Sequence, residues 1–114
     1  MNKSELMDIN TIESLRSVLK EGIYELFNTF ITDCPATIER LANAIKDNNV
    51  AEINEAAHYL KGSGGNIGAI AFYNACSTLE YQAKDNALIE PKAQMDNVRQ
   101  LFEETVNYMK KQMG

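Results

Sequence analysis

The chain has 114 residues, enough for one domain with one hydrophobic core. Eleven basic and sixteen acidic residues give a net charge of −5, which argues against a nucleic-acid partner because such binding needs a basic face. No apolar run is long enough to span a bilayer and no signal-type stretch follows the N-terminus, so we expect a cytoplasmic protein without membrane association. Two cysteines, Cys34 and Cys76, and a single histidine argue against a disulfide framework and a zinc site.

The first expected element is a short helix near the N-terminus. Asn10, followed three residues later by Glu13, resembles a capping box with Asn in place of Ser or Thr, and it predicts a helix over residues 11–19. The preceding residues 1–9 are expected to be loose, or to pack through Leu6 and Ile9. The inward positions of the helix would be Ile12, Leu15 and Leu19, and Glu21-Gly22 would end it.

A long helix is expected over residues 23–46. Its apolar stripe keeps its phase throughout and contains Ile23, Leu26, Phe27, Phe30, Ile31, Cys34, Ile38, Leu41, Ala42 and Ile45. Pro35 removes a backbone donor in the middle, so the helix should either kink near residues 31–34 or break in two, with Asp33 capping the second piece. The continuous stripe favours the kink.

Three more helices are expected after the turn formed by residues 47–49. They cover residues 50–67, residues 70–84 and a last segment that has Glu90 near its start and Pro91 in its first turn. The inward residues of the last two are Phe72, Cys76, Leu79 and Ala83, and then Met95, Val98, Leu101, Phe102, Val106 and Met109. Four long amphipathic helices with short connections predict an all-α, antiparallel four-helix bundle, capped at one end by the short N-terminal helix. No second apolar face is evident, so we expect a monomer.

Residues 58–69 contain the only histidine of the chain and four of its six glycines. His58 lies about 130° around the helix from the stripe formed by Val50, Ile53, Ala57, Leu60 and Ile67, so its ring should face solvent. Gly62 and Gly65, one and two turns further along that face, leave the ring uncovered, and Lys61 can bring its ammonium group alongside.

Three of these glycines fall inside the expected helix. Relative to alanine they lower the stability of the domain by up to about 3 kcal/mol together, so their presence calls for an explanation. Access for a bulky partner is the interpretation for Gly62 and Gly65. Gly64 falls on the core stripe, where close contact with a facing helix explains it, and Gly68 is expected to end the helix. An exposed imidazole beside a cation suits a histidine that carries an anion to a docked protein, and an incidental surface histidine is the alternative.

Two segments carry a family resemblance. Ala57-His58-Tyr59-Leu60-Lys61-Gly62-Ser63, followed by Gly68-Ala69, resembles the signature of the histidine-containing phosphotransfer (HPt) domain. Cys76-Ser77-Thr78-Leu79-Glu80 is similar to the next helix of that family. One departure is Gly64, where the family commonly has serine or alanine. The resemblance implies one HPt-like helical domain over residues 1–114.

The resemblance also implies roles for single residues. His58 would be phosphorylated on Nε2, Lys61 would offset the phosphoryl charge, and Gly62 and Gly65 would give clearance. Glu80 would bond to the histidine ring and orient it, unless it is a solvated glutamate. Ser63 lies off the His58 face and is expected to bond to backbone or water. The helical spacing alone places Asn54 and Glu55 beside His58, where Asn54 could donate a hydrogen bond and Glu55 could raise the histidine pKa; a solvated pair is the favoured interpretation.

The implied partners are receiver domains of response regulators and a hybrid sensor histidine kinase, docking over His58 and the exposed edge of the second helix. The chain has no Walker loop and no kinase motif set, so we expect a phosphocarrier without its own ATP chemistry or cofactor, and the receiver would bring the Mg²⁺. A non-catalytic helical adaptor that binds a receiver or kinase domain is the main alternative. A di-iron bundle needs the Glu-x-x-His step twice, and residues 55–58 supply it once.

Overall fold

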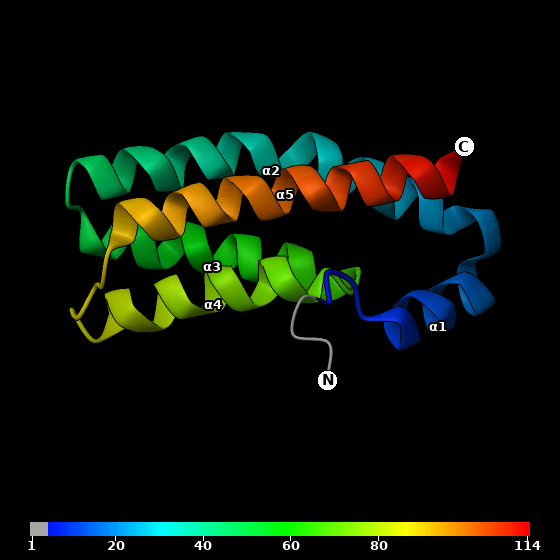
Figure 1. Ribbon diagram of the computed structural model, residues 1–114, viewed down its shortest axis with the longest axis horizontal. Coiled ribbons are helices and arrows are strands. Elements are labelled where there is room, and N and C mark those ends of the chain that lie inside the picture. The colour runs from blue at the N-terminus through cyan, green and yellow to red at the C-terminus, as the bar shows by residue number, and fades with distance from the viewer. Residues whose placement is uncertain (1–4) are drawn as a thin grey trace.

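The apolar spacing of the chain is realised as five α-helices in the computed structural model, which describes residues 5–114 (Figure 1). They are α1 (Ile9–Leu19), α2 (Ile23–Lys46), α3 (Val50–Asn66), α4 (Ile70–Lys84) and α5 (Pro91–Met113), with a 3₁₀ turn at Lys20–Gly22. The described residues contain no strand. Each expected helix is present with bounds that differ by two residues at most.

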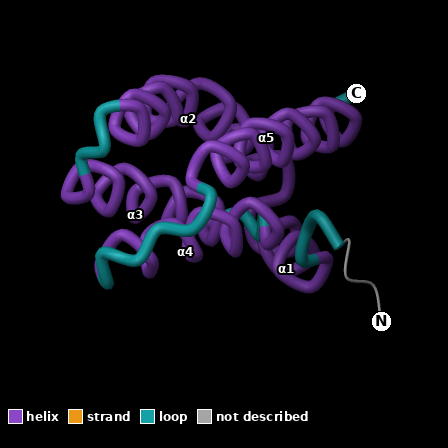
Figure 2. The backbone as a smooth tube through the Cα atoms, turned by 60° about the vertical axis from the view of Figure 1, so that its left-hand side comes forward, coloured by secondary structure: helices purple, strands orange, loops and turns teal. Residues whose placement is uncertain are grey.

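Helices α2 to α5 form the expected antiparallel four-helix bundle (Figure 1). Helices α2 and α4 each pack against both α3 and α5, and short loops join successive helices (Figure 2). The rings of Phe30, Phe72 and Phe102, from three different helices, meet in the core with centroids 5.3 to 6.0 Å apart. Contacts of this kind favour the fold because they bury large apolar surfaces in one place.

Helix α2 continues without a break through Pro35, whose ring lies on the exposed side of the helix. The alternative of two shorter helices, with Asp33 capping the second, is therefore wrong. The side chains on either side of the proline explain why the helix continues. Phe30, Cys34 and Ile38 all lie in the core, so one apolar face holds both halves of the helix against the bundle.

The sharp turn between α3 and α4 depends on Gly68. Its φ of +73° follows the end of α3, and its N–H donates to Gly65 O at 3.3 Å while that of Ala69 donates to Gly64 O at 2.9 Å. These two bonds make a Schellman motif, as expected for a glycine that ends a helix. A Cβ at Gly68 would lie 3.0 Å from Cβ of Thr11, so the turn packs tightly against α1 and leaves no room for a side chain.

Helix α1 begins two residues earlier than expected and has a different cap. The side chain of Asp8, not Asn10, accepts the free N–H groups of Asn10 at 3.1 Å and of Thr11 at 3.5 Å. Asp8 can do this because its own N–H donates to Gly68 O at 2.7 Å, which fixes the entry of the helix on the α3–α4 turn.

The helix lies at one end of the bundle (Figure 1), where Arg16 donates to the Gln112 side chain of α5 at 3.0 Å. Its expected apolar contacts hold only in part. Ile12 is buried as expected, but Leu19 remains 38% exposed because the helix ends there. Leu6 packs against the core as expected, but Ile9 is exposed and Met7 is buried in the core. Residues 1–4 of that expected loose segment lie outside the described residues.

Candidate functional site

His58 projects from the middle of α3 with 67% of its side chain exposed. The opposite face of the helix is buried in the bundle and consists of Ile53, Ala56, Ala57, Leu60 and Gly64. The outward direction of the imidazole, predicted from the helical period, is confirmed. A histidine held this way is open to a second protein, yet its backbone is fixed by the core packing of its own helix.

Glu80, on the neighbouring helix α4, bridges His58 and Lys61. One carboxylate oxygen, Oε2, lies 2.6 Å from Nδ1 of His58, and the other, Oε1, accepts from Nζ of Lys61 at 2.7 Å. Only 18% of the Glu80 side chain is exposed, because α4 packs closely on α3. The two helices thus place a carboxylate against one ring nitrogen and a cation beside that carboxylate.

The charges in this bridge reinforce one another. Partial burial acts to raise the pKa of Glu80, but hydrogen bonds from Lys61 and His58 outweigh it and hold the pKa below its usual value. The hydrogen bond to Glu80 raises the pKa of Lys61 in turn. An ionised carboxylate can only accept hydrogen bonds, so Nδ1 of His58 carries a proton. In the neutral ring the lone pair is then on Nε2.

We predict that Glu80→Gln changes how the stability of the domain depends on pH. A folded-state pKa below the unfolded one stabilises the fold above the unfolded value of about 4.5, and the gain is lost as pH falls through the folded pKa. The free energy of unfolding of the wild type should therefore fall more steeply below about pH 4.5 than that of the variant. Urea titrations between pH 3 and 7 measure this, and parallel profiles would contradict the bridge.

The glycines that follow His58 differ in what surrounds them. A Cβ at Gly62 would meet no atom of residues 5–114 within 4 Å, so the surface one turn after the histidine is open. A Cβ at Gly65 would lie 3.1 and 3.3 Å from two ring atoms of Tyr73 on α4. The space beside Gly65 is thus filled by that ring, and we correct our interpretation of Gly65 from clearance for a partner to packing of Tyr73.

Gly64 leaves no room for a side chain between α3 and α4. A Cβ at this position would lie 2.9 Å from Cδ2 of Phe72, whose ring is fully buried. The expected contact with a facing helix is confirmed. We predict that Gly64→Ala lowers the free energy of unfolding by about 1–2 kcal/mol, because overpacking outweighs the gain in helix propensity. Urea denaturation measures this, and a variant as stable as the wild type would show that the ring can move aside.

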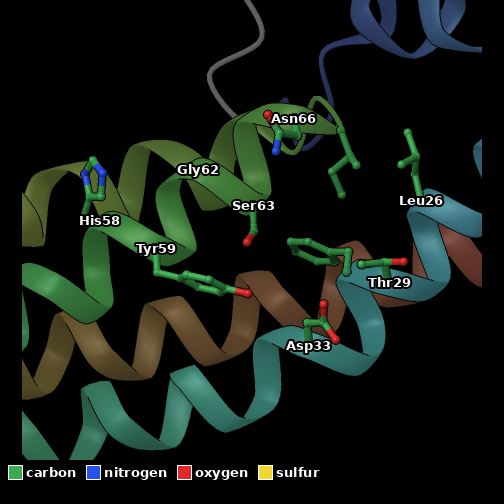
Figure 3. A pocket seen from close by; sticks show the side chains of 10 residues that line it. Leu26, Thr29, Asp33, His58, Tyr59, Gly62, Ser63 and Asn66 are labelled. Atoms are coloured by element: carbon green, nitrogen blue, oxygen red, sulfur yellow. The ribbon is translucent and has the colours of Figure 1, made fainter.

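A groove of about 470 Å³ lies beside His58, between α3 and α2 (Figure 3). Figure 3 shows Tyr59 and Ser63 entering this space from α3, and Thr29 and Asp33 facing them from α2. The floor and sides are mostly apolar or neutral, and the lining residues are Leu26, Thr29, Phe30, Asp33, His58, Tyr59, Gly62, Ser63, Asn66 and Ile67. The open surface at Gly62 is continuous with the groove.

Comparison with known protein families agrees with this geometry. The family model of the Hpt domain matches residues 25–108, which include α3, α4 and nearly all of α2. The chain belongs to the Hpt domain family. Proteins of this family are phosphocarriers that work with kinases and receiver domains, so the chain is a histidine phosphotransfer protein of phosphorelays.

The fold of this Hpt domain has a solved counterpart. The crystal structure of histidine-containing phosphotransfer protein B (HptB) from Pseudomonas aeruginosa PAO1 superposes with a TM-score of 0.89 over 96% of each chain, at 23% sequence identity. At this identity the likeness shows the fold, which is the HPt four-helix bundle. A search of curated protein sequences returned no match.

Side chains of α3 near His58 reach both neighbouring helices of this Hpt domain. Ser63 lies beside the Cys34 thiol of α2; burial raises the pKa of Cys34 to about 12, and the neighbouring Ser63 hydroxyl lowers it only in part. Asn54 donates to the backbone oxygen of Glu80 at 3.0 Å and so ties α3 to α4 one turn before His58. Glu55 lies 3.3 Å from Arg40 of α2. Glu55 is 75% exposed and stays a solvated residue, as expected, whereas the bond of Asn54 to Glu80 corrects the interpretation of Asn54.

The bond of Asn54 to Glu80 and the contact of Ser63 with Cys34 link α3 to both of its neighbours. They could not be read from the sequence, since each depends on a residue brought close by the bundle. Residues 5–114 contain no group of three or more His, Cys, Asp or Glu side chains arranged to hold a metal ion. None of the helices in the described part of the chain is long and apolar enough to cross a membrane.

Proposed function

We propose that this Hpt domain relays a phosphoryl group between aspartates of receiver domains and that His58 carries it on Nε2. One observation carries the proposal. The only histidine in the chain is exposed, and its Nδ1 is bonded to the carboxylate of Glu80. The bond leaves Nε2 as the nitrogen with a lone pair and without a protein partner among the described residues, which is the condition a nucleophile needs.

In the transfer step one P–N bond forms and one P–O bond breaks, and no proton needs to leave the domain. Nε2 of His58 attacks the phosphorus of a receiver aspartyl phosphate, the P–O bond to the aspartate breaks, and the aspartate leaves as a carboxylate. The ring becomes a phosphoimidazolium that keeps its proton on Nδ1. Glu80, 2.6 Å away, stabilises the positive charge that forms on the ring. The reverse sequence returns the phosphoryl group to another receiver.

Lys61 and Gly62 support this step in different ways. The Lys61 ammonium has three donors and uses one at 2.7 Å on Glu80, so others remain for the phosphoryl oxygens on the neighbouring ring. Gly62 leaves the surface beside the imidazole open. A receiver domain can then bring its aspartate to the distance that in-line transfer requires.

The groove between α3 and α2 is the surface on which we place the receiver. It begins at His58, runs along about two and a half turns of α3 and presents mostly apolar and neutral side chains, as the centre of a protein interface does. The receiver supplies the Mg²⁺ that stabilises the transferring group, and this domain works as a monomeric carrier without nucleotide chemistry or a cofactor of its own.

Phosphotransfer from a labelled receiver tests this proposal. Receiver domains phosphorylated with ³²P, one at a time from a broad panel, are freed of kinase and nucleotide and mixed with the wild-type chain and Mg²⁺. Label that appears on this chain, is lost in acid and resists base is expected, because P–N bonds behave in this way and acyl phosphates do not. The absence of label from every receiver, together with retained binding to one of them, would favour the adaptor.

A further inference from the structure

Among residues 5–114, Asp33 is the one acidic side chain that lines the groove beside His58. It lies on the exposed side of α2, and Figure 3 shows its carboxylate directed toward the space that Tyr59 and Ser63 enter from α3. No ion pair within residues 5–114 includes Asp33. Its hydrogen bond from the Thr32 hydroxyl is long, at 3.5 Å.

The position of Asp33 along the helices places it under any protein that covers His58. The next residue of α2, Cys34, lies beside Ser63, and Asp33 and Ser63 line the same groove, so Asp33 lies level with a residue five positions beyond His58 on α3. At 1.5 Å per residue, this is about 7 Å along the helix axis. A stable protein contact covers about 800 Å² on each partner, which extends well past that distance.

Among residues 5–114, those that line the groove include no lysine or arginine. Lys61 is bonded to Glu80 at 2.7 Å, and Arg40 is bonded to Glu52 at 2.7 Å. Asp33 has no such cation among residues 5–114, and a phosphoryl group on His58 would add further negative charge to the same surface. A partner that covers Asp33 with an apolar or acidic side chain therefore leaves an unpaired carboxylate, whereas a basic side chain compensates it.

We infer that Asp33 is a specificity-determining residue, which favours receiver domains that place a lysine or arginine over the groove when their aspartate meets His58. The inference rests on the proposed function, since it names the kind of receiver that the same site selects. It concerns recognition and not chemistry. Asp33 should therefore affect the concentration of receiver needed for transfer and not the maximal rate.

Kinetics with charge variants test this inference. The receiver used is the one that exchanges label with the wild type fastest, and its surface lysines and arginines are replaced singly by glutamate. Asp33→Asn should raise the half-saturating receiver concentration about two- to fivefold, and Asp33→Lys about tenfold or more, with unchanged maximal rates. One lysine or arginine replacement in the receiver should restore transfer with Asp33→Lys. Glu103→Lys on α5, a helix that does not pack on α3, is the control with the same charge change.

The outcomes separate this inference from the proposed function. Wild-type transfer with unchanged half-saturation in both Asp33 variants would overturn the role of Asp33 alone. An equal effect of Glu103→Lys would also overturn it, because net charge would then explain the change. A wild type that takes label from no receiver contradicts the proposed function instead. If Asp33→Lys lowers the melting temperature, the half-saturating receiver concentration of Asp33→Asn is the deciding measurement, because the amide keeps the size of the side chain.

Discussion

His58→Gln is expected to leave a folded Hpt domain that accepts no phosphoryl group. Glutamine can still donate a hydrogen bond to Glu80, but its amide nitrogen has no lone pair available for attack. Loss of the nucleophile in covalent transfer removes the step, so the rate should fall by more than about a thousandfold. The measurement is ³²P transfer from the receiver to the variant, at several receiver concentrations.

The fold of this variant should be intact, because 67% of the His58 side chain is exposed and it contributes little to the core. Substitutions at such positions usually change stability by no more than about 0.5 kcal/mol. Lys61 keeps its bond to Glu80 and continues to stabilise that carboxylate. Circular dichroism and urea denaturation of the variant should therefore overlay those of the wild type.

Binding of a receiver to His58→Gln distinguishes the carrier from the adaptor. Calorimetric titration should give similar affinities for variant and wild type, since the groove and Gly62 are unchanged. Loss of transfer with retained binding is the result that the carrier requires. Acid-labile label on the variant would contradict the assignment of His58, because the chain contains no second histidine that could hold it.

The helices of this domain could be predicted closely from the sequence, for local physical reasons. Helix α2 was predicted over the residues that it occupies, because its apolar positions hold one phase on both sides of Pro35. The start of α5 was marked by Pro91, which fits the first turn of a helix. The predicted start of α1 was wrong because two nearby residues could each cap the helix. Asp8 and Asn10 both suit a helix start, and only the bond from Asp8 to the distant Gly68 decides between them.

The site could be predicted only in part, because half of it comes from contacts between helices. The outward direction of His58 follows from the period of α3 alone. The bond to Glu80 joins residues 22 positions apart and was expected only through the family resemblance. That Lys61 bonds to the same carboxylate was not expected, nor was the ring of Tyr73 against Gly65. Both depend on how closely α4 approaches α3, which a helical period does not specify.

Gly62→Gln is expected to block phosphotransfer from receivers while it leaves the fold intact. In the described part of the chain no atom lies within 4 Å of a Cβ at this position, so the bundle can accommodate a side chain without strain. Replacing a helical glycine should even raise the free energy of unfolding, by up to about 1 kcal/mol. The new side chain would project beside the imidazole, since residues four apart share a helix face. A receiver aspartate could then no longer reach Nε2 in line, and transfer should fall by about a hundredfold.

Two comparisons isolate clearance as the cause. Gly62→Ala also replaces the helical glycine and should stabilise the helix as Gly62→Gln does. It adds only a methyl group, so its transfer rate should stay within a few-fold of the wild type. A small phosphodonor, such as phosphoramidate, needs no protein surface around His58 and should phosphorylate both variants at similar rates. Equal transfer from a receiver to Gly62→Gln and Gly62→Ala would show that the open surface is not needed. A loss with both donors would place the effect of Gly62 on the ring itself and not on the approach of the receiver.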